Sequence, residues 1–263
     1  MEIRSLAARY GGQHAGMKYS GPPRSEVRVP APIAAVAGDR PLLPVWQNEL
    51  GGLTFQIGSG EGRLFAKWAP AGSGLDLAAE DARLRWAGRF AAVPRVRDYG
   101  ADEGGAWLVT HGLPGESAVS PRWKADPRQA VRALGAGLRA LHERLPVADC
   151  PFSWSVDHRL ERAGNAGMEV PADLSPYPPI DHLVVCHGDP CAPNTLLHED
   201  GSWSGHVDMG ALGVADRWAD LAVATWNTGW NYGPGWEDAL LDAYGIAPDP
   251  YRMDFYRRLW NAT

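Results

Sequence analysis

The sequence predicts an α+β fold with two lobes: a small N-terminal antiparallel β lobe and a larger, mainly helical C-terminal lobe. Short apolar segments separated by glycine-rich turns fill residues 42–68, which is typical of consecutive antiparallel strands. Residues 126–145 carry apolar side chains at alternating three- and four-residue steps, which indicates an amphipathic helix. A chain of 263 residues is long enough to bury a core in each lobe.

The N-terminal lobe is expected to span residues 27–110. Its first expected strands are apolar runs bounded by turn residues, at 43–46, 53–57 and 64–68. A further strand pair is expected at 95–99 and 106–110. An Ala-rich, charged segment at 76–90 is expected to form a helix. Residues 1–26 carry glycine, proline and scattered charge, so we expect a loose N-terminal extension ahead of this lobe.

The C-terminal lobe is expected to span residues 111–263. Its expected elements, in chain order, are the helix at 126–145, the strands at 183–186 and 195–197, and helices after Asp216 that are interrupted at 229–235 and at Pro248 and Pro250. Proline can neither continue a helix nor donate to a strand ladder, so the proline-rich stretch 171–179 is expected to be an extended connection.

Composition and charge narrow the classes of partner. A formal net charge of −6 gives no basic surface for nucleic acid, and no apolar run is long enough to span a membrane. Residues 1–26 lack the apolar core of a secretory signal, so export is not expected. Three cysteines do not make a disulfide framework, so a reducing cytoplasm is the expected location. The sequence does not indicate the oligomeric state.

Two segments carry oxygen-bearing side chains in the order that phosphoryl transfer requires. Residues 184–194 read VVCHGDPCAPN, and residues 205–210 read GHVDMG. In kinases a loop Asp accepts the proton of the attacking hydroxyl, an Asn holds a magnesium ion, and a later Asp holds magnesium against the nucleotide phosphates. We assign these roles to Asp189, Asn194 and Asp208. The chain is therefore expected to be an ATP-dependent kinase that uses Mg²⁺.

Lys67 lies inside an otherwise apolar strand segment, LFAKW. A buried lysine needs an anionic partner, and Glu80 on the following helix is the expected one. A lysine on an edge strand that faces solvent is the alternative. Because the two candidate loop aspartates follow downstream, we favour a nucleotide-binding role for Lys67 and Glu80.

Four further residues are candidates for nucleotide binding. Gly52 and Thr54 lie at a glycine turn between two strands, where backbone N–H groups and a hydroxyl can reach phosphate oxygens; an ordinary hairpin turn is the alternative. Thr110 and Gly112 lie in the segment 107–112, which we expect to be the hinge between the lobes, with backbone groups that bind adenine.

The same loops allow a different chemistry. His187, Asp189, His206 and Asp208 form two His-x-Asp units, which can hold zinc in a hydrolase. That hypothesis gives no role to the lysine, to its glutamate partner or to the loop asparagine. We favour a buried His187 whose hydrogen bonds brace the catalytic loop.

The motifs resemble those of the aminoglycoside phosphotransferases, kinase-like enzymes that phosphorylate a hydroxyl of an antibiotic. The resemblance runs from about Trp46 to the C-terminus and is most specific at 185–194 and 208–222. It implies a protein-kinase-like fold, ATP and Mg²⁺ as cofactors, and an aminoglycoside substrate, phosphorylated at the 3′ hydroxyl or, in streptomycin, at the 3″ hydroxyl. It also implies that Asp216 and Asp220 are buried carboxylates that brace the catalytic loop.

The substrate side departs from the family pattern. Ala211 replaces the usual Arg, residues 226–231 replace acidic residues, and residues 259–263 lack the usual acidic, aromatic ending. The segment 152–184 is also shorter than usual. Because carboxylates are the strong partners of ammonium groups, a kinase for another sugar, nucleoside or metabolite is the alternative assignment. A nucleotide-binding pseudokinase is the non-enzymatic alternative.

Three tryptophans in the departing segments have two interpretations. Trp226, Trp230 and Trp260 either stack on a sugar ring or pack in the core, and core packing is favoured for any single tryptophan. The acidic residues that remain available for a cationic substrate are Asp157, Glu161, Glu237 and Asp238.

Overall fold

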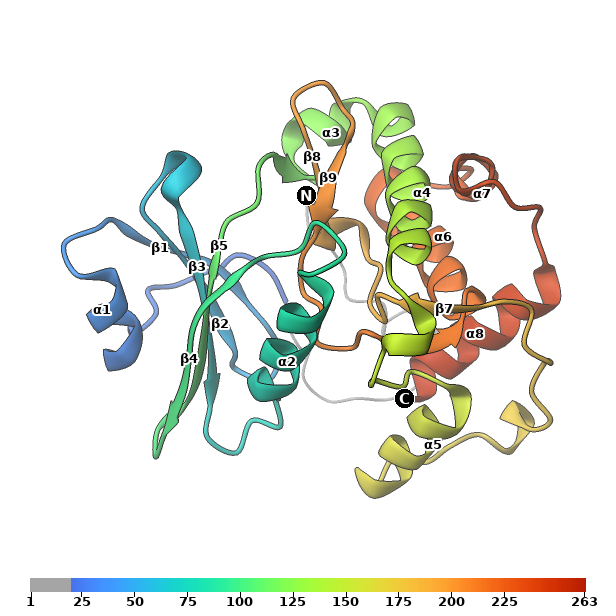
Figure 1. Cartoon of the computed structure of the whole chain (residues 1–263), viewed down its shortest axis with the longest axis horizontal. Coiled ribbons are helices and arrows are strands. Elements are labelled where there is room, and N and C mark those ends of the chain that lie inside the picture. Colours follow the sequence, from blue (N-terminus) through green and yellow to red (C-terminus); the bar gives the residue numbers. More distant parts are fainter. Residues whose placement is uncertain (1–19) are drawn as a thin grey trace. The chain divides into compact units, whose positions relative to one another are not determined.

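The structure, a computed structural model, describes residues 20–263 (Figure 1). Residues 1–19 of the predicted N-terminal extension lie outside the described residues. The chain divides into two compact units. Of the described residues, the first unit holds 20–81 and 96–112, and the second holds 82–95 and 113–263.

A five-stranded antiparallel sheet forms the first unit, in the order β1-β2-β3-β5-β4. Its strands are β1 (Leu42–Gln47), β2 (Leu53–Ile57), β3 (Leu64–Pro70), β4 (Val96–Asp102) and β5 (Gly105–His111). All five predicted strands are confirmed. Four are largely apolar runs closed by turn residues, whereas β4 reads VRDYGAD and is held by pairing with β5. Strand β5 continues through His111, so the segment 107–112, predicted as a hinge, is strand except for its last residue.

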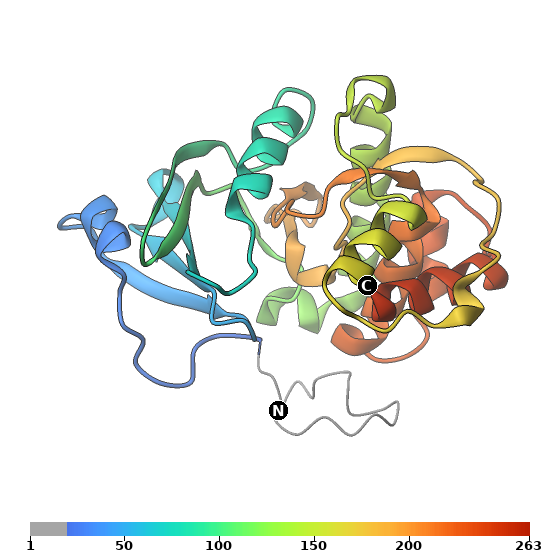
Figure 2. The same cartoon turned by 90° about the horizontal axis from the view of Figure 1, so that it is seen from below.

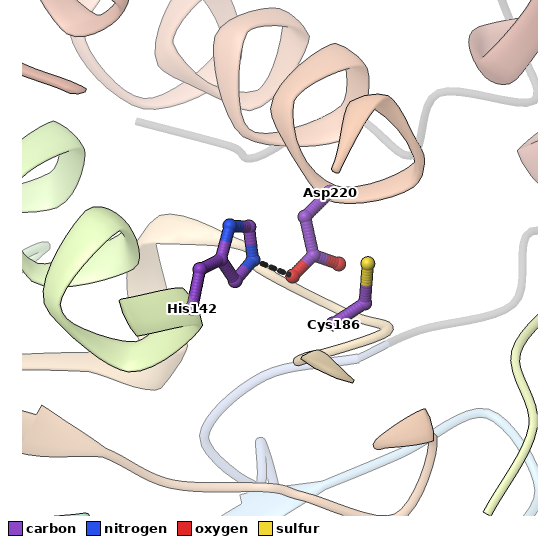
Figure 3. A group of neighbouring side chains, drawn as sticks. All are labelled: His142, Cys186 and Asp220. Atoms are coloured by element: carbon purple, nitrogen blue, oxygen red, sulfur yellow. Dashed lines mark hydrogen bonds and ion pairs between the residues drawn. The ribbon is translucent and has the colours of Figure 1, made fainter. Parts of the chain in front are cut away.

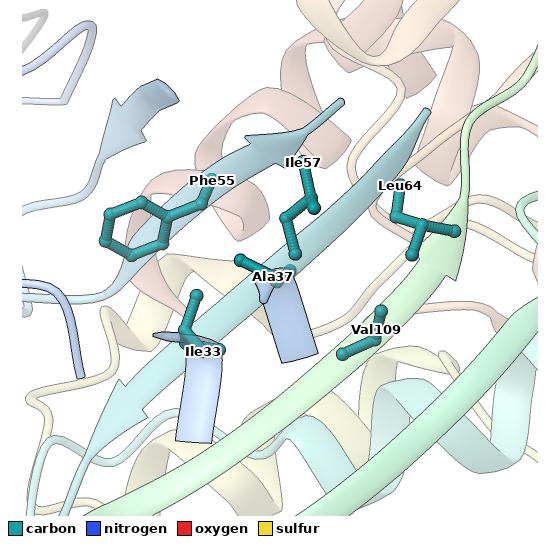
Figure 4. Packing of buried hydrophobic residues seen from close by; sticks show 7 residues of the cluster. Ile33, Ala37, Phe55, Ile57, Leu64 and Val109 are labelled. Atoms are coloured by element: carbon teal, nitrogen blue, oxygen red, sulfur yellow. The ribbon is translucent and has the colours of Figure 1, made fainter. Parts of the chain in front are cut away.

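One face of this sheet is covered by α1 (Ala31–Ala37), which lies outside the predicted elements. Side chains of α1 pack on apolar side chains of β2, β3 and β5 (Figure 4). The buried cluster consists of Ile33, Ala37, Phe55, Ile57, Leu64, Ala66 and Val109. At seven residues the helix is too short to produce a recognisable periodicity in the sequence.

Helix α2 (Leu77–Ala87) confirms the predicted helix but ends before the predicted limit at residue 90. The Asp76 side chain accepts a hydrogen bond from the backbone N–H of Ala79 (2.9 Å), which caps the start of the helix. The division between the two units falls inside α2, after Asp81.

Helices dominate the second unit. They are α3 (Pro121–Ala125), α4 (Pro127–Arg144), α5 (Val156–Asn165), α6 (Trp218–Tyr232), α7 (Glu237–Tyr244) and α8 (Pro250–Ala262). Helix α4, the predicted amphipathic helix, packs against α7, and α6 packs against α8. The end of α8 lies beside α5 (Figure 2), where the Arg159 guanidinium donates to the Thr263 hydroxyl (2.7 Å). Within residues 20–263, no helix is both long and apolar enough to cross a membrane.

The second unit differs from expectation in three places. Helix α6 continues through Gly229 and ends at Tyr232, so the predicted interruption at 229–235 starts too early. An exposed glycine weakens a helix without ending it; the end comes at Gly233, which has φ 89°. The stretch 171–179 contains a 3₁₀ turn at Ala172–Leu174 rather than being extended throughout. Helices α3 and α5 lie outside the predicted elements.

Two small sheets carry the polar loops of the second unit. Strand β7 (Leu183–Cys186) pairs antiparallel with β10 (Gly213–Asp216). Strand β8 (Thr195–Leu197) pairs antiparallel with β6 (Glu116–Ser117) and with β9 (Trp203–His206). Strands β7 and β8 confirm the two predicted strands, whereas their pairing partners are too short to recognise by pattern.

Candidate active site

A β-hairpin brings together the two polar loops identified in the sequence. Strand β8 begins directly after Asn194, β9 ends directly before Val207, and the two strands pair with each other. The backbone N–H of Val207 donates to the carbonyl of Asn194 (2.9 Å). Asp208, the next residue, is therefore held next to the loop that carries Asp189 and Asn194.

Asp189 and Asn194 are hydrogen-bonded to each other. The Asn194 side-chain amide donates to Asp189 Oδ2 (3.1 Å) and to the Asp189 carbonyl (3.0 Å). Asp189 Oδ1 is buried and has no hydrogen-bond partner within residues 20–263, so it can accept a hydrogen bond or a proton from a substrate. Burial, followed by the charge of Asp208, raises the pKa of Asp189. A raised pKa makes this carboxylate a stronger base.

Asp208 adopts a left-handed backbone conformation, with φ 63°. Non-glycine residues rarely take this conformation, and it is retained where the surroundings impose it. The backbone around Gly188 is also tightly packed: a Cβ atom there would lie 2.2 Å from the carbonyl oxygen of Ala211. The loop of Asp189 and the loop of Asp208 therefore meet too closely for any side chain at position 188.

A buried carboxylate on α6 fixes the start of the catalytic loop. Asp220 accepts hydrogen bonds from the backbone N–H groups of His187 (2.6 Å) and Gly188 (2.9 Å). His142 Nε2 lies 3.0 Å from Asp220 Oδ2 (Figure 3), and the other ring nitrogen of His142 lies 2.9 Å from the Tyr244 hydroxyl. Burial opposes the charge, but hydrogen bonds from His142 and from the backbone N–H of Gly188 outweigh it, so the pKa of Asp220 is lowered. The predicted bracing role of Asp220 is confirmed.

Asp216 has a different role from the one that the family resemblance implied. Its carboxylate accepts hydrogen bonds from the backbone N–H groups of Trp218 (3.0 Å) and Asp181 (2.7 Å). Asp216 therefore binds the backbone N–H of the first residue of α6 and holds the segment before β7, rather than bracing the catalytic loop directly. Burial raises its pKa.

His187 braces the catalytic loop, as favoured from the sequence. The residue is fully buried, its Nε2–H donates to the carbonyl of Val207 (3.0 Å), and its Nδ1 accepts from the N–H of Asp189 (3.2 Å). Because both ring nitrogens are engaged, His187 has none to offer a zinc ion. This geometry argues against the hydrolase hypothesis.

A cluster of potential metal ligands does occur within residues 20–263, at His142, Cys186 and Asp220, whose ligand atoms lie within 4.8 Å of one another (Figure 3). Its atoms are already engaged in hydrogen bonds. Cys186 Sγ donates to the carbonyl of Asp216 (3.4 Å), and burial raises the pKa of this thiol well above its usual value. A thiol that stays protonated is a poor metal ligand. We therefore interpret this cluster as structural.

In the first unit, Lys67 and Glu80 form the predicted ion pair. Lys67 Nζ lies 2.7 Å from one carboxylate oxygen of Glu80 and 2.9 Å from the other. The Glu80 side chain is 6% exposed and the Lys67 side chain is 27% exposed. The buried glutamate therefore orients a lysine whose side chain remains partly accessible.

Thr54 and Thr110 share the sheet face of Lys67. Thr54 pairs directly with Lys67 across β2 and β3, and side chains that lie opposite each other in an antiparallel pair share a face. Thr110 pairs with Phe65, two residues before Lys67, so it projects to the same side. The cluster packed under α1 occupies the alternate positions and hence the other face.

The two candidate glycines use their N–H groups inside the first unit. Asn48 Oδ1 accepts hydrogen bonds from the N–H groups of Leu50 (3.0 Å) and Gly52 (2.7 Å). The N–H of Gly112 donates to the carbonyl of Arg63 (2.9 Å). Binding of phosphate by Gly52 or of adenine by Gly112 therefore stays a prediction.

Asn227 on α6 is a site residue that the sequence analysis did not identify. Its buried Oδ1 accepts hydrogen bonds from the backbone N–H of Ala192 (2.6 Å) and from the side chain of Asn231 (2.9 Å). Ala192 begins the 3₁₀ turn η5 (Ala192–Asn194), which ends the catalytic loop. Helix α6 therefore holds both ends of the loop, through Asp220 and Asn227. These two residues lie seven positions, or about two helical turns, apart. This spacing places them on one side of the helix and is the feature of the sequence that indicates a shared role.

Comparison with known proteins gives the family. A family model described as "Phosphotransferase enzyme family" matches residues 48–256, a range that contains both the ion pair and the polar loops. The chain belongs to this family. This match confirms the family resemblance that the sequence motifs of the phosphotransferase suggest.

Curated relatives match most of the length of this phosphotransferase. The aminoglycoside 3′-phosphotransferase of Streptomyces fradiae is 36% identical over 249 residues, which span 81% of this chain and 91% of the relative. The streptomycin 3″-kinase of Streptomyces griseus is 35% identical over 264 residues, which span 86% of this chain and 93% of the relative.

A solved structure confirms the protein-kinase-like α+β fold of the phosphotransferase. Aminoglycoside phosphotransferase APH(3″)-Id from Streptomyces rimosus matches with a TM-score of 0.69 at 28% identity, covering 86% of this chain and 94% of that one. The same enzyme in complex with ADP and streptomycin matches with a TM-score of 0.65.

Proposed function

We propose that this phosphotransferase transfers the γ-phosphate of ATP to a hydroxyl of an aminoglycoside. The hydrogen-bonded pair Asp189 and Asn194, with Asp208 on the adjoining loop, carries the proposal. The named activities of the relatives, and the ADP and streptomycin in a related structure, support the donor and the acceptor class. The 3′ hydroxyl is the proposed acceptor, and the 3″ hydroxyl of streptomycin is the alternative.

Asp189 is the proposed catalytic residue. Its unpartnered Oδ1 accepts the proton of the attacking hydroxyl, while Oδ2 is held by Asn194. Phosphoryl transfer demands little covalent chemistry from the protein, so orientation and charge stabilisation provide most of the rate. The rigid loop between His187 and Asn194, fixed at both ends by α6, provides the orientation.

The donor set of this loop pair fits a Mg²⁺ ion, which prefers carboxylate and carbonyl oxygens. Asn194 directs its NH₂ group at Asp189, which leaves Oδ1 for a cation, and the side chain of Asp208 is exposed. Besides burial, the charge of Asp208 raises the pKa of Asp189, and a bound cation relieves that repulsion. When bound, Mg²⁺ neutralises charge on the phosphate oxygens.

Lys67, oriented by Glu80, is proposed to contact the phosphates of ATP. Thr54 and Thr110 on the same sheet face, with Gly52 and Gly112, are proposed to complete the nucleotide site. ATP is made and kept in the cytoplasm, so we propose a cytoplasmic location, where the three cysteines stay as free thiols.

Mass spectrometry of reaction mixtures tests the proposed function. The purified protein with Mg²⁺ and ATP is incubated with kanamycin, neomycin and streptomycin, and in parallel with pooled simple sugars and nucleosides. Addition of one phosphate to an aminoglycoside is the expected result, and fragmentation identifies the hydroxyl. Phosphorylation of a sugar or nucleoside alone overturns the substrate class. ATP binding without any product identifies a pseudokinase and overturns the proposal.

Replacing Lys67 with methionine is expected to raise the KM for ATP or lower kcat so that kcat/KM for ATP falls by about 10- to 100-fold. The estimate corresponds to the loss of one charge-assisted hydrogen bond. Lys124→Met is the matched control, because Lys124 is exposed on α3. Steady-state kinetics at saturating acceptor measures both variants. Equal kinetics for Lys67→Met and Lys124→Met contradict the nucleotide-binding role.

A further inference from the structure

Three tryptophans from two helices meet in the second unit. The ring centroids of Trp226 and Trp230 on α6 lie 4.8 Å apart, and Trp260 on α8 lies 6.5 Å from the first and 6.3 Å from the second. All three side chains are half-buried. We call this cluster the indole wall. Packing in the core would require fully buried rings, whereas these three rings remain partly accessible.

The N–H groups of the indole wall are available to a ligand. Within residues 20–263 none of the three Nε1 atoms has a hydrogen-bond partner, and none is among the buried unpaired atoms. They therefore reach solvent. Buried tryptophans usually find a partner for this group. Three free donors beside three ring faces form a surface that can bind a molecule with both C–H and hydroxyl groups.

Two of the indoles lie on a strip of α6 next to the side that holds the catalytic loop. Helix α6 contacts that loop through Asp220 and Asn227, which lie on one side of the helix. At 3.6 residues per turn, Trp230 lies about 60° and Trp226 about 100° around the axis from Asn227. The two indoles thus occupy the strip of α6 that adjoins the side holding the loop.

Local charge at the indole wall is balanced. The Arg257 guanidinium lies 6.0 Å from the centroid of the Trp226 ring, and it is ion-paired with Glu237 (2.8 Å). Glu237 is one of the acidic residues that the sequence offers for a cationic substrate, but its carboxylate is already ion-paired with Arg257. Recognition at this place therefore depends on the ring faces and the indole N–H groups rather than on a free carboxylate.

We propose that the indole wall binds the amino-sugar ring of the acceptor and sets acceptor specificity. The C–H face of a pyranose packs on an indole face, an ammonium group is attracted to the ring quadrupole, and the Nε1–H groups donate to sugar hydroxyls. This inference rests on the proposed function. It explains how acidic side chains can be absent from residues 226–231 in a phosphotransferase that acts on a cationic sugar.

Substitution of Trp230 tests the indole wall. Trp230→Leu is expected to raise the KM for the accepted aminoglycoside by about 5- to 30-fold, with kcat and the KM for ATP near wild type. Trp230→Phe, which keeps a ring, is expected to restore most of the affinity. Trp46→Leu is the matched control, because Trp46 is 37% exposed on β1. An unchanged acceptor KM in Trp230→Leu overturns the inference.

Two further measurements distinguish failure of this inference from misfolding of a variant and from failure of the proposed function. Thermal melts of Trp230→Leu and of Trp260→Leu report folding, and a folded Trp260→Leu with raised acceptor KM supports the wall even if the first variant unfolds. Normal acceptor KM in every folded variant overturns the wall. If the wild type phosphorylates no aminoglycoside, the proposed function fails instead, and the substrate panel reveals that before any variant is made.

Discussion

Replacing Asp189 with asparagine is expected to lower kcat by about 10²- to 10⁴-fold, the usual contribution of a general base. Asparagine has nearly the same shape and can still accept the hydrogen bond from Asn194, but it cannot take a proton. The KM for ATP is expected to stay near that of the wild type. Single-turnover and steady-state measurements with the accepted aminoglycoside provide the test.

The same substitution is expected to leave the metal-free protein as stable as the wild type or more stable. The pKa of Asp189 is raised in the folded state by burial and by Asp208, so the carboxyl stabilises the fold at low pH and loses that contribution as pH rises. A neutral asparagine removes the repulsion at neutral pH. Asp200→Asn, in the exposed turn between β8 and β9, is the control. A kcat near wild type contradicts the assignment of Asp189 as general base. An unfolded Asp189→Asn contradicts the expected effect on stability.

The sequence predicts those elements whose pattern is local and long. Helix α4 is recognisable because its apolar repeat continues over five turns and Asp126 caps it. The sheet of the first unit is recognisable because each strand is closed by turn residues. Helix α1 is not, because its seven residues acquire their role only by packing on the sheet.

The candidate site divides in the same way. Asp189, Asn194 and Asp208 are recognisable because each has a fixed place in a short motif, and one hairpin joins the two loops. The residues that hold the loop come from α4, α6 and α7, where no local pattern marks them. Asn227 and His142 therefore emerge only once the helices are packed. For Asp216 the motif predicts a buried carboxylate correctly, but it does not indicate which backbone N–H groups this carboxylate binds.

Asp220→Asn is expected to destabilise the fold by about 3 kcal/mol or more at neutral pH, because it replaces a buried acceptor of charge-assisted hydrogen bonds by a group that also carries donors. The backbone N–H groups of His187 and Gly188 and the ring of His142 all point at this carboxylate. For a domain of this size the melting temperature is expected to fall by about 6–12 °C. Differential scanning calorimetry measures the change.

The pH dependence of that change distinguishes Asp220 from Asp216. Because the folded-state pKa of Asp220 is lowered, its stabilisation is fully present above the ordinary Asp pKa of about 3.9 and is lost as pH falls through the folded-state pKa. The gap between wild type and Asp220→Asn should therefore narrow in acid. Asp216, whose pKa is raised by burial, gives the opposite sign, so the gap between wild type and Asp216→Asn should widen in acid, and Asp216→Asn should cost less than Asp220→Asn at neutral pH. Equal melting temperatures for the two variants at pH 7 would show that the Asp220 carboxylate does not hold the catalytic loop.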